Sequence, residues 1–378
     1  MQTEIYRAAW LHDGTQLHHG AALVVQGGQV AGVLGADDPL PGGARLHDLG
    51  AGGIAPGMVD LQVNGGGGVM LTPAPGAIAR ICAAHARLGA TSILPTLITD
   101  TPEATAGVIE AAILAHSARV PGFLGLHLEG PHLDPRRHGA HDPALIRAMT
   151  ADDLALYLRA ARALPGLMIT LAPESASPAQ ISELARAGVV VSLGHSACSF
   201  EAAQAAISAG ARCVTHLYNA MSPLNHRAPG LVGAALDGDV AVGVISDGVH
   251  VAAPALRLAL KAKPTAQLFL VSDSMAVAGT DQAEFTLGGR QILRCDGRLT
   301  LTDGTLAGAD ISLPQSVAHL VAVGCGLERA LAMTSAVPAD VINAPVGRLV
   351  AGRAADFVHL DAALALSGVW QAGRRLEG

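Results

Sequence analysis

The stretch Val189-Val-Val-Ser-Leu-Gly-His195 is an apolar run that ends on a histidine, and similar runs recur through the middle of the chain. Each is four to eight residues long and ends in or is followed by polar residues. Such runs are typical of strands buried on both faces of a parallel sheet. In chain order they span residues 57–63, 91–97, 123–129, 167–172, 189–195, 213–218, 240–247 and 267–273.

Alanine-rich segments lie between these runs, and we expect helices at 77–88, 177–187 and 200–209. Eight apolar strands that alternate with helices predict an α/β fold, a (β/α)8 TIM-like barrel. Barrels of this kind place their chemistry at the carboxyl ends of the strands, which is where the polar residues of this chain stand.

Both ends of the chain differ from this middle, because glycine turns break them into short strands. Residues 21–25 and 29–34 flank Gln26-Gly-Gly28 as in a hairpin, and short apolar runs return after residue 346. We therefore predict a small β-sandwich domain built from both termini, residues 1–53 plus 346–378, and a barrel domain over 54–345. A glycine-rich insert at 288–308 is expected to form a hairpin or a lid.

The composition of the 378-residue chain limits its function. Half of the residues are apolar and 3% are aromatic, which suits helices packed on a buried sheet better than a surface that stacks nucleic-acid bases. The net charge is −7 and no extended Lys/Arg run occurs, so we expect neither a nucleic-acid nor a membrane partner. An anionic small molecule stays possible as a substrate, since a few cations in a pocket suffice for it.

The sequence also predicts where the protein is found. Residues 1–10 carry Glu4 and Arg7 without an apolar core, unlike a signal peptide. No apolar stretch reaches the roughly 18 residues that a membrane span needs. The five cysteines form no CxxC pair, which indicates reduced thiols. We expect a soluble, cytoplasmic protein.

Glu129, His195 and His216 fall at the ends of the third, fifth and sixth predicted strands. Two imidazoles and one carboxylate that converge from neighbouring strands are typical of a catalytic Zn²⁺ site with one open position. The same set suits Fe²⁺ or another divalent ion. A single histidine could merely cap its strand, but three residues at equivalent strand ends favour one divalent ion per subunit.

Asp273 ends the eighth predicted strand and is a candidate general acid and base. A carboxylate near the attacking water can take its proton and hand it to the leaving amine; the alternative is that Asp273 caps the following helix. At the first strand, Gln62 and Asn64 share a face. Many metal hydrolases of this fold carry His-x-His there, so we interpret the two amides as vestigial second-metal positions.

Eight short motifs connect these residues along the chain. They are Asp60-Leu-Gln-Val-Asn-Gly-Gly-Gly-Gly68, His127-Leu-Glu-Gly-Pro131, Gly139-Ala-His141, Ser192-Leu-Gly-His-Ser196, Thr215-His-Leu-Tyr-Asn-Ala-Met221, Asp247-Gly-Val-His250, Val271-Ser-Asp-Ser-Met275 and Thr305-Leu-Ala-Gly308. In this order they resemble the N-acetylglucosamine-6-phosphate deacetylases of the amidohydrolase superfamily, and the likeness extends to the segment 347–357.

The resemblance implies hydrolysis of N-acetyl-D-glucosamine 6-phosphate to D-glucosamine 6-phosphate and acetate, in amino-sugar catabolism. It implies that Glu129, His195 and His216 bind the metal, that Asp273 is the catalytic acid and base, and that His141 assists near the acetyl carbonyl. The substrate-binding positions that it implies are Ala140, His141, Asn219, Ala220, Arg227, His250, Leu306, Ala307 and Gly308. It also implies a homodimer, or a tetramer, with Arg227 and His250 near the interface, and a loop at 306–308 that closes on the substrate.

Arg227 supports a phosphate site independently, because a guanidinium offers two donors to a phosphate, although a surface ion pair is the alternative.

Two other functions remain open: a deacetylase for N-acetylgalactosamine 6-phosphate or another N-acyl compound, and a catalytically silent relative that binds a phosphosugar. Two departures from the family pattern concern His132 with the run Arg136-Arg-His138, which we expect to face solvent, and Ser274, whose effect we expect to be minor.

Overall fold

Eight parallel strands lie side by side in the middle of the chain. The structure is a computed structural model that describes residues 2–377. The strands are β8 (Val59–Val63), β11 (Ser92–Ile98), β12 (Leu126–Glu129), β13 (Leu167–Leu171), β14 (Val190–Leu193), β15 (Cys213–Val214), β16 (Ala241–Val244) and β17 (Leu268–Leu270), each paired with the next. Hydrogen bonds from Asp273 N to Gln62 O (3.1 Å) and from Asn64 N to Ser274 O (2.8 Å) join the last strand to the first. The predicted α/β barrel is confirmed, and every predicted apolar run overlaps a strand.

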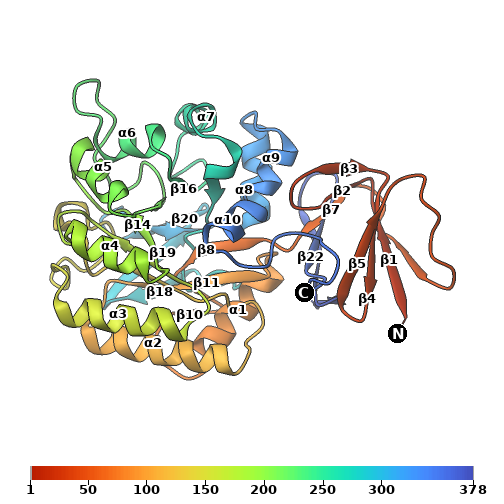
Figure 1. Cartoon of the computed structure of the whole chain (residues 1–378), viewed down its shortest axis with the longest axis horizontal. Coiled ribbons are helices and arrows are strands. Elements are labelled where there is room, and N and C mark those ends of the chain that lie inside the picture. Colours follow the sequence, from red (N-terminus) through yellow and green to blue (C-terminus); the bar gives the residue numbers. More distant parts are fainter. Residues whose placement is uncertain (1, 378) are drawn as a thin grey trace.

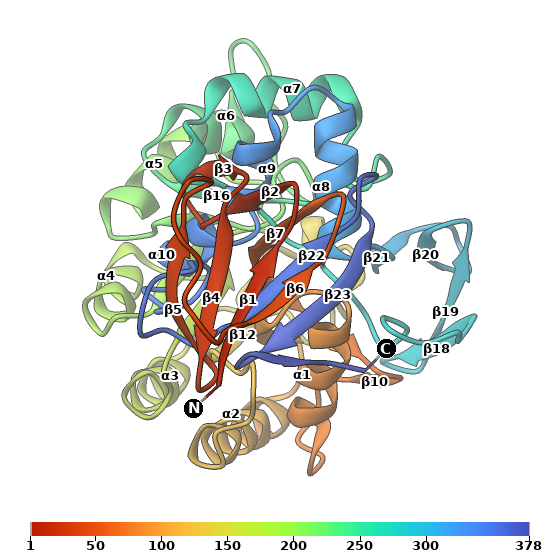
Figure 2. The same ribbon diagram turned by 90° about the vertical axis from the view of Figure 1, so that its right-hand side faces the viewer.

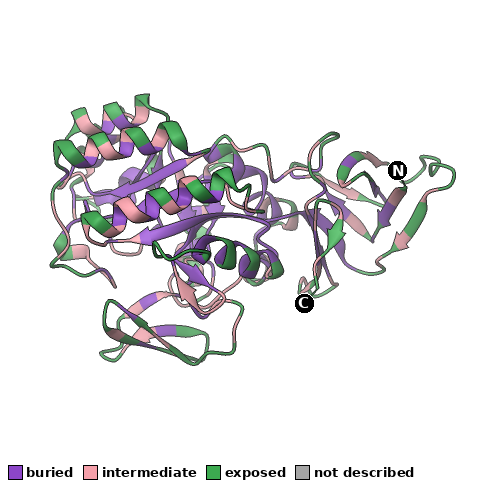
Figure 3. Cartoon of the chain, turned by 90° about the horizontal axis from the view of Figure 1, so that it is seen from below, coloured by how far each residue is buried: buried purple, intermediate pink, exposed green. Residues whose placement is uncertain are grey.

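Helices wrap the outside of this barrel (Figure 1). They are α1 (Ala77–Arg87), α2 (Pro102–Ser117), α3 (Ala151–Ala163), α4 (Pro178–Arg186), α5 (Phe200–Ser208), α6 (Gly230–Asp237), α7 (Ala253–Ala262), α8 (Leu313–Ala322), α9 (Leu327–Ala332) and α10 (Ala336–Val341), with 3₁₀ turns at Pro135–Arg137 and Thr265–Gln267. The helices predicted at 77–88, 177–187 and 200–209 are α1, α4 and α5. Their buried sides face the strands and their exposed sides face outward (Figure 3), as expected of amphipathic helices. In the described part of the chain, no helix is both long and apolar enough to cross a membrane.

A chain of hydrogen bonds crosses the barrel interior just below the carboxyl ends of the strands. Ser192 and Thr215 lie 2.6 Å apart, Thr215 and Thr170 2.6 Å, and Thr170 contacts Nε2 of His127 at 2.8 Å. The chain ends where Nδ1 of His127 donates to the carbonyl of Leu61 at 2.9 Å. Burial lowers the pKa of His127 to about 4, so the ring is neutral. Because buried polar groups rigidify a core when all are paired, this layer fixes five strands relative to one another beneath the site.

The two ends of the chain form a separate pair of sheets beside the barrel (Figures 1 and 2). One sheet has the order β5-β4-β1-β6 and the other β24-β23-β22-β7-β2-β3. Their bounds are β1 (Thr3–Arg7), β2 (Trp10–His12), β3 (Leu17–His19), β4 (Ala22–Gln26), β5 (Gln29–Leu34), β6 (Arg45–Asp48), β7 (Gly53–Pro56), β22 (Phe357–Leu360), β23 (Leu366–Gln371) and β24 (Arg374–Arg375). Phe357 stacks on Trp370 in their core, and Tyr6 contacts both rings edge-on. The predicted small β-sandwich from both termini is confirmed as a fold, whereas the exact domain boundaries stay a prediction.

An antiparallel sheet stands out from the barrel between β17 and α8 (Figure 2). It consists of β18 (Glu284–Leu287), β19 (Arg290–Cys295), β20 (Arg298–Leu301) and β21 (Leu306–Ala309). It therefore begins before the glycine-rich insert predicted at 288–308. A short hairpin, β9 (Gly65–Gly66) with β10 (Val69–Met70), follows β8 on the same side of the barrel.

The prediction that His132 faces solvent is wrong, because its side chain is fully buried. Nδ1 of His132 contacts the carbonyl of Arg147 at 3.1 Å, and Nε2 lies 3.0 Å from the hydroxyl of Tyr157 in α3. A carbonyl only accepts, so Nδ1 donates to it and Nε2 accepts from Tyr157. His132 thus fastens the loop after β12 to α3. Arg136, in contrast, is exposed as predicted, with an ion pair to Asp134.

We predict that His132→Ala lowers the free energy of unfolding by about 2–4 kcal/mol, because it leaves the Tyr157 hydroxyl unpaired beside a new cavity. Urea unfolding followed by circular dichroism measures the change. The matched control is His116→Ala on the exposed side of α2, for which we expect at most about 0.5 kcal/mol. Equal losses for the two variants would contradict a structural role of His132.

Candidate active site

The predicted site residues gather at the carboxyl ends of the barrel strands, around a cavity of about 240 Å³. Glu129 is the last residue of β12, and His195, His216 and Asp273 follow β14, β15 and β17 within a few residues. These four residues line the cavity. The rest of its wall consists of Asn64, Ile98, Gly139, Ala140, Asn219, Ala220, Ile245, His250, Met275, Thr305, Leu306 and Gly308.

The backbone turns sharply at three of these residues. The φ angle is 47° at His195, 29° at His216 and 50° at Asp273, in the left-handed region that side chains other than glycine rarely adopt. Such a conformation costs on the order of 1–3 kcal/mol per residue and persists only where surrounding contacts fix it. Four of the ten non-glycine residues with such angles in the described chain, His195, His216, Ala220 and Asp273, are candidate functional residues.

Three ligand-type atoms meet in the cavity. Nε2 of His195 and Nε2 of His216 lie 3.0 Å apart, and Oε1 of Glu129 lies 3.4 and 3.2 Å from them. Ligands about 2.0–2.1 Å from a tetrahedral zinc ion are roughly 3.3 Å from one another. Nδ1 of His195 is 2.8 Å from the carbonyl of Arg137 and must donate to it, so Nε2 keeps its lone pair free. The donor set therefore fits a divalent cation.

The same three groups influence one another's ionisation. Burial opposes the charge of Glu129, but contacts with His195 and His216 hold the pKa of its carboxyl well below the usual range. Burial also favours neutral His216, yet the Glu129 contact raises the pKa of this imidazole. The cluster therefore stabilises positive charge at its centre, either a proton or a metal ion.

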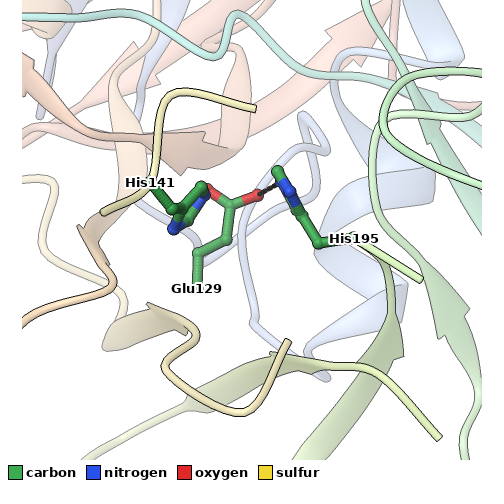
Figure 4. A group of neighbouring side chains, drawn as sticks. All are labelled: Glu129, His141 and His195. Carbon is green, nitrogen blue, oxygen red and sulfur yellow. Dashed lines mark ion pairs between the residues drawn. The ribbon is translucent and has the colours of Figure 1, made fainter. Parts of the chain in front are cut away.

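His141 lies on the other side of Glu129 (Figure 4). Its Nε2 is 3.9 Å from Oε2 of Glu129, and Glu129, His141 and His195 form a second possible metal-holding group whose ligand atoms all lie within 4.8 Å of one another. The group with His216 is the more tightly spaced of the two.

Thr99 determines which nitrogen of His141 carries the proton. The backbone N–H of Thr99 donates to Nδ1 at 3.2 Å, and the Thr99 hydroxyl lies 2.8 Å from the same atom. Burial, together with the neighbouring His195, lowers the pKa of His141 to about 3, so the ring is neutral. Its single proton is therefore on Nε2. This nitrogen is a hydrogen-bond donor, not a free lone pair.

Two amides hold the carboxylate of Asp273. Nδ2 of Asn64 donates to Oδ1 at 2.7 Å, and Nε2 of Gln62 donates to Oδ1 at 3.2 Å and to Oε1 of Glu129 at 2.8 Å. No hydrogen bond from the described residues reaches Oδ2 of Asp273, so this oxygen is available to a ligand in the cavity. Burial, and then the charge of Glu129, raise the pKa of Asp273 to about 6.

The remaining predicted residues fall into two groups. Ala140, Asn219, Ala220, His250, Leu306 and Gly308 line the cavity, and Nδ1 of His250 contacts Oδ2 of Asp247 at 2.6 Å. Ala307 is instead buried in the apolar core of the insert, and Arg227 lies on an exposed loop outside the cavity wall. Within one chain, Arg227 is therefore not brought to the site.

Two contributors were missed by sequence reasoning. Thr99 follows the second predicted strand, so its place at a strand end was a usable signal. Arg290 donates to the carbonyl of Ala140 from the insert, and no sequence pattern marks that contact. Gly308 is needed where it stands: its φ is 70°, and a Cβ there would lie 2.7 Å from the carbonyl oxygen of Asp273.

Comparison with known proteins identifies the family. A model of the amidohydrolase family matches residues 54–374. The N-acetylgalactosamine-6-phosphate deacetylase of Shewanella sp. (strain ANA-3) is 40% identical over 335 residues, covering 87% of this chain and 84% of that protein. The N-acetylglucosamine-6-phosphate deacetylase of Danio rerio is 37% identical over 342 residues, with 85% and 84% covered.

A solved structure extends this similarity to the whole fold. The crystal structure of N-acetylglucosamine-6-phosphate deacetylase from Pasteurella multocida has a TM-score of 0.93 and 32% identity, and the match covers 100% of both chains. The chain therefore belongs to the amidohydrolase family and, within it, to the N-acetylglucosamine-6-phosphate deacetylase family that its motifs predicted.

Proposed function

We propose that this protein hydrolyses the acetamide of N-acetyl-D-glucosamine 6-phosphate, releasing acetate and D-glucosamine 6-phosphate in amino-sugar catabolism. The observation that carries the proposal is the placement of Asp273 beside the buried cluster of Glu129, His195 and His216, in one cavity. One relative is named for N-acetylgalactosamine 6-phosphate and another for N-acetylglucosamine 6-phosphate, which supports N-acetyl amino sugar 6-phosphates as the substrate class. A catalytically silent protein would have no need to keep all four groups together.

Glu129, His195 and His216 would hold one divalent cation, and their spacing favours Zn²⁺, with Fe²⁺ or another divalent ion as the alternative. When bound, the cation supplies a Lewis acid for the acetamide carbonyl and makes the attacking water more acidic. His141 suits this role less well because its Nε2 carries the proton. Gln62 and Asn64 direct N–H groups at the carboxylates, and neutral amides are weaker ligands for such a cation than imidazoles, which supports one ion per subunit.

Asp273 moves the protons of the reaction. Its free Oδ2 takes a proton from the water that attacks the acetyl carbon, and later returns it to the nitrogen as the C–N bond breaks. The amides of Asn64 and Gln62 hold Oδ1 and so aim Oδ2 at the cavity. Burial and then the charge of Glu129 raise the pKa of Asp273, which favours its uptake of the proton.

His141 stabilises the charge that develops on the carbonyl oxygen. Its Nε2–H is fixed as a donor by Thr99 and needs no rearrangement during the reaction, which is the condition for effective electrostatic stabilisation. Asn219, Ala220 and His250 would bind the sugar and its phosphate. The loop 306–308 would close over them.

A homodimer would complete the phosphate site, and a tetramer is the alternative. Arg227 is exposed and lies outside its own chain's cavity, so we propose that it serves the site of a second subunit, with His250 near that interface.

A cytoplasmic location fits the cysteines, since all five are unpaired and four of them are buried.

Asp273→Asn should lower kcat by roughly 10²–10⁴-fold, because an amide cannot take up the proton. We expect the metal content to stay the same, since Asp273 is not one of the proposed ligands. Steady-state acetate release with elemental analysis tests both points. Asp237→Asn, at an exposed position at the end of α6, is the control. Near-normal turnover of the Asp273 variant would remove this residue from the proposed role.

Metal content separates the two possible ligand groups. His216→Ala should purify with little bound metal, whereas His141→Ala should keep close to one ion per subunit and lose kcat by roughly 10²–10³-fold, as for a lost oxyanion donor. A strong chelator should abolish activity of the unmodified protein, and added Zn²⁺ should restore it. If His141→Ala loses the metal and His216→Ala keeps it, the assignment of ligands is wrong.

Substrate comparison tests specificity. Removal of the 6-phosphate should lower kcat/KM by roughly 10²-fold or more, since each charged hydrogen bond contributes about 1.5–3 kcal/mol. Arg227→Ala should remove part of this preference. We expect the glucosamine epimer to be turned over faster than the galactosamine epimer; the reverse order would favour the activity in the name of the Shewanella relative.

A further inference from the structure

Asp134 lies in the loop after β12 and precedes the Arg136-Arg-His138 run, and it has no part in the proposed reaction. Its side chain is 3% exposed although Arg136, its ion-pair partner, is 68% exposed. A buried carboxylate beside an exposed partner needs other donors, because burial of a charge is costly unless it is hydrogen-bonded. Those donors lie on the two segments that surround His195.

Asp134 contacts His195 and the segment that follows it. The backbone N–H of Asp134 donates to the carbonyl of His195 at 2.8 Å. The backbone N–H of Ala197 donates to Oδ2 of Asp134 at 3.2 Å. Because His195 has a left-handed φ of 47°, it depends on such contacts to keep its conformation.

Asp134 also builds the turn that contacts the His195 ring. Its Oδ1 accepts from the N–H of Arg136 at 2.9 Å, and its carbonyl accepts from the N–H of Arg137 at 2.8 Å. This turn, Pro135–Arg137, presents the Arg137 carbonyl to Nδ1 of His195. The backbone of Asp134 thus contacts His195 and the turn, and its carboxylate joins the turn at Arg136 to Ala197, two residues after His195.

We propose that Asp134 is a positioning residue that holds His195 ready to bind the metal. The proposal rests on the proposed function, specifically on His195 as a ligand. Partners that orient a metal-bound histidine typically contribute a factor of about 10–100 to metal affinity. Asp134 does not touch the cavity, so its effect reaches the metal only through His195 and the Arg137 carbonyl.

The test is the Zn²⁺ affinity of the full-length protein, measured by competition with a chromophoric chelator. Asp134→Ala should weaken Zn²⁺ binding by about 10–100-fold. Asp134→Asn keeps an acceptor oxygen and should weaken it less, by roughly tenfold at most. The matched control is Asp13→Ala, which removes a carboxylate that accepts from the N–H groups of Thr15 and Gln16 in a turn of the small domain; its Zn²⁺ affinity should stay unchanged.

His195→Ala separates this proposal from the proposed function. If His195→Ala loses Zn²⁺ binding while both Asp134 variants bind as tightly as the unmodified protein, the positioning role is overturned. If His195→Ala itself binds normally, the metal site is wrong and the positioning role falls with it. Should Asp134→Ala not fold, Asp134→Asn decides: weaker Zn²⁺ binding at an unchanged unfolding midpoint supports the proposal, and unchanged binding overturns it.

Discussion

The close approach of two imidazole nitrogens and one carboxylate oxygen, all within 3.0–3.4 Å of one another, is the constraint on which the site depends. Such groups crowd together in a buried place only if positive charge lies between them. The barrel makes this possible because parallel strands end at one rim, where His195 and His216 leave their strands in a strained backbone conformation. The polar layer around His127 keeps those strand ends in register.

The proposed metal ligands and the proposed proton-transfer residue, Asp273, are linked by hydrogen bonds. The amide of Gln62 donates to both Glu129 and Asp273, so a movement of either carboxylate displaces the amide that binds the other. Thr99 makes Nε2 of His141 a hydrogen-bond donor, whereas Nε2 of His216 is proposed to bind the metal. Glu129, His195, His216 and Asp273 thus line one cavity, and Nε2 of His141 lies 3.9 Å from the carboxylate of Glu129.

Much of the fold could be predicted, because buried strands and alanine-rich helices leave local patterns. The structure brings Glu129, His195, His216 and Asp273 to one cavity, as expected from their places at strand ends. What escaped prediction depends on contacts between distant segments: His132 is buried since Tyr157 offers it a partner from α3, and the Arg137 carbonyl meets His195 from 58 residues away. The left-handed backbone at His195, His216 and Asp273 and the contact of Arg290 with Ala140 do not change the spacing of apolar residues, so no sequence pattern predicts them.

Anomalous diffraction at the zinc absorption edge, from crystals of the zinc-loaded protein, tests the central claim most directly. The account predicts one anomalous peak per subunit, bonded to Glu129, His195 and His216, with Oδ2 of Asp273 facing the open coordination position. A peak bonded to His141 in place of His216, or a second peak between Gln62 and Asn64, would contradict it.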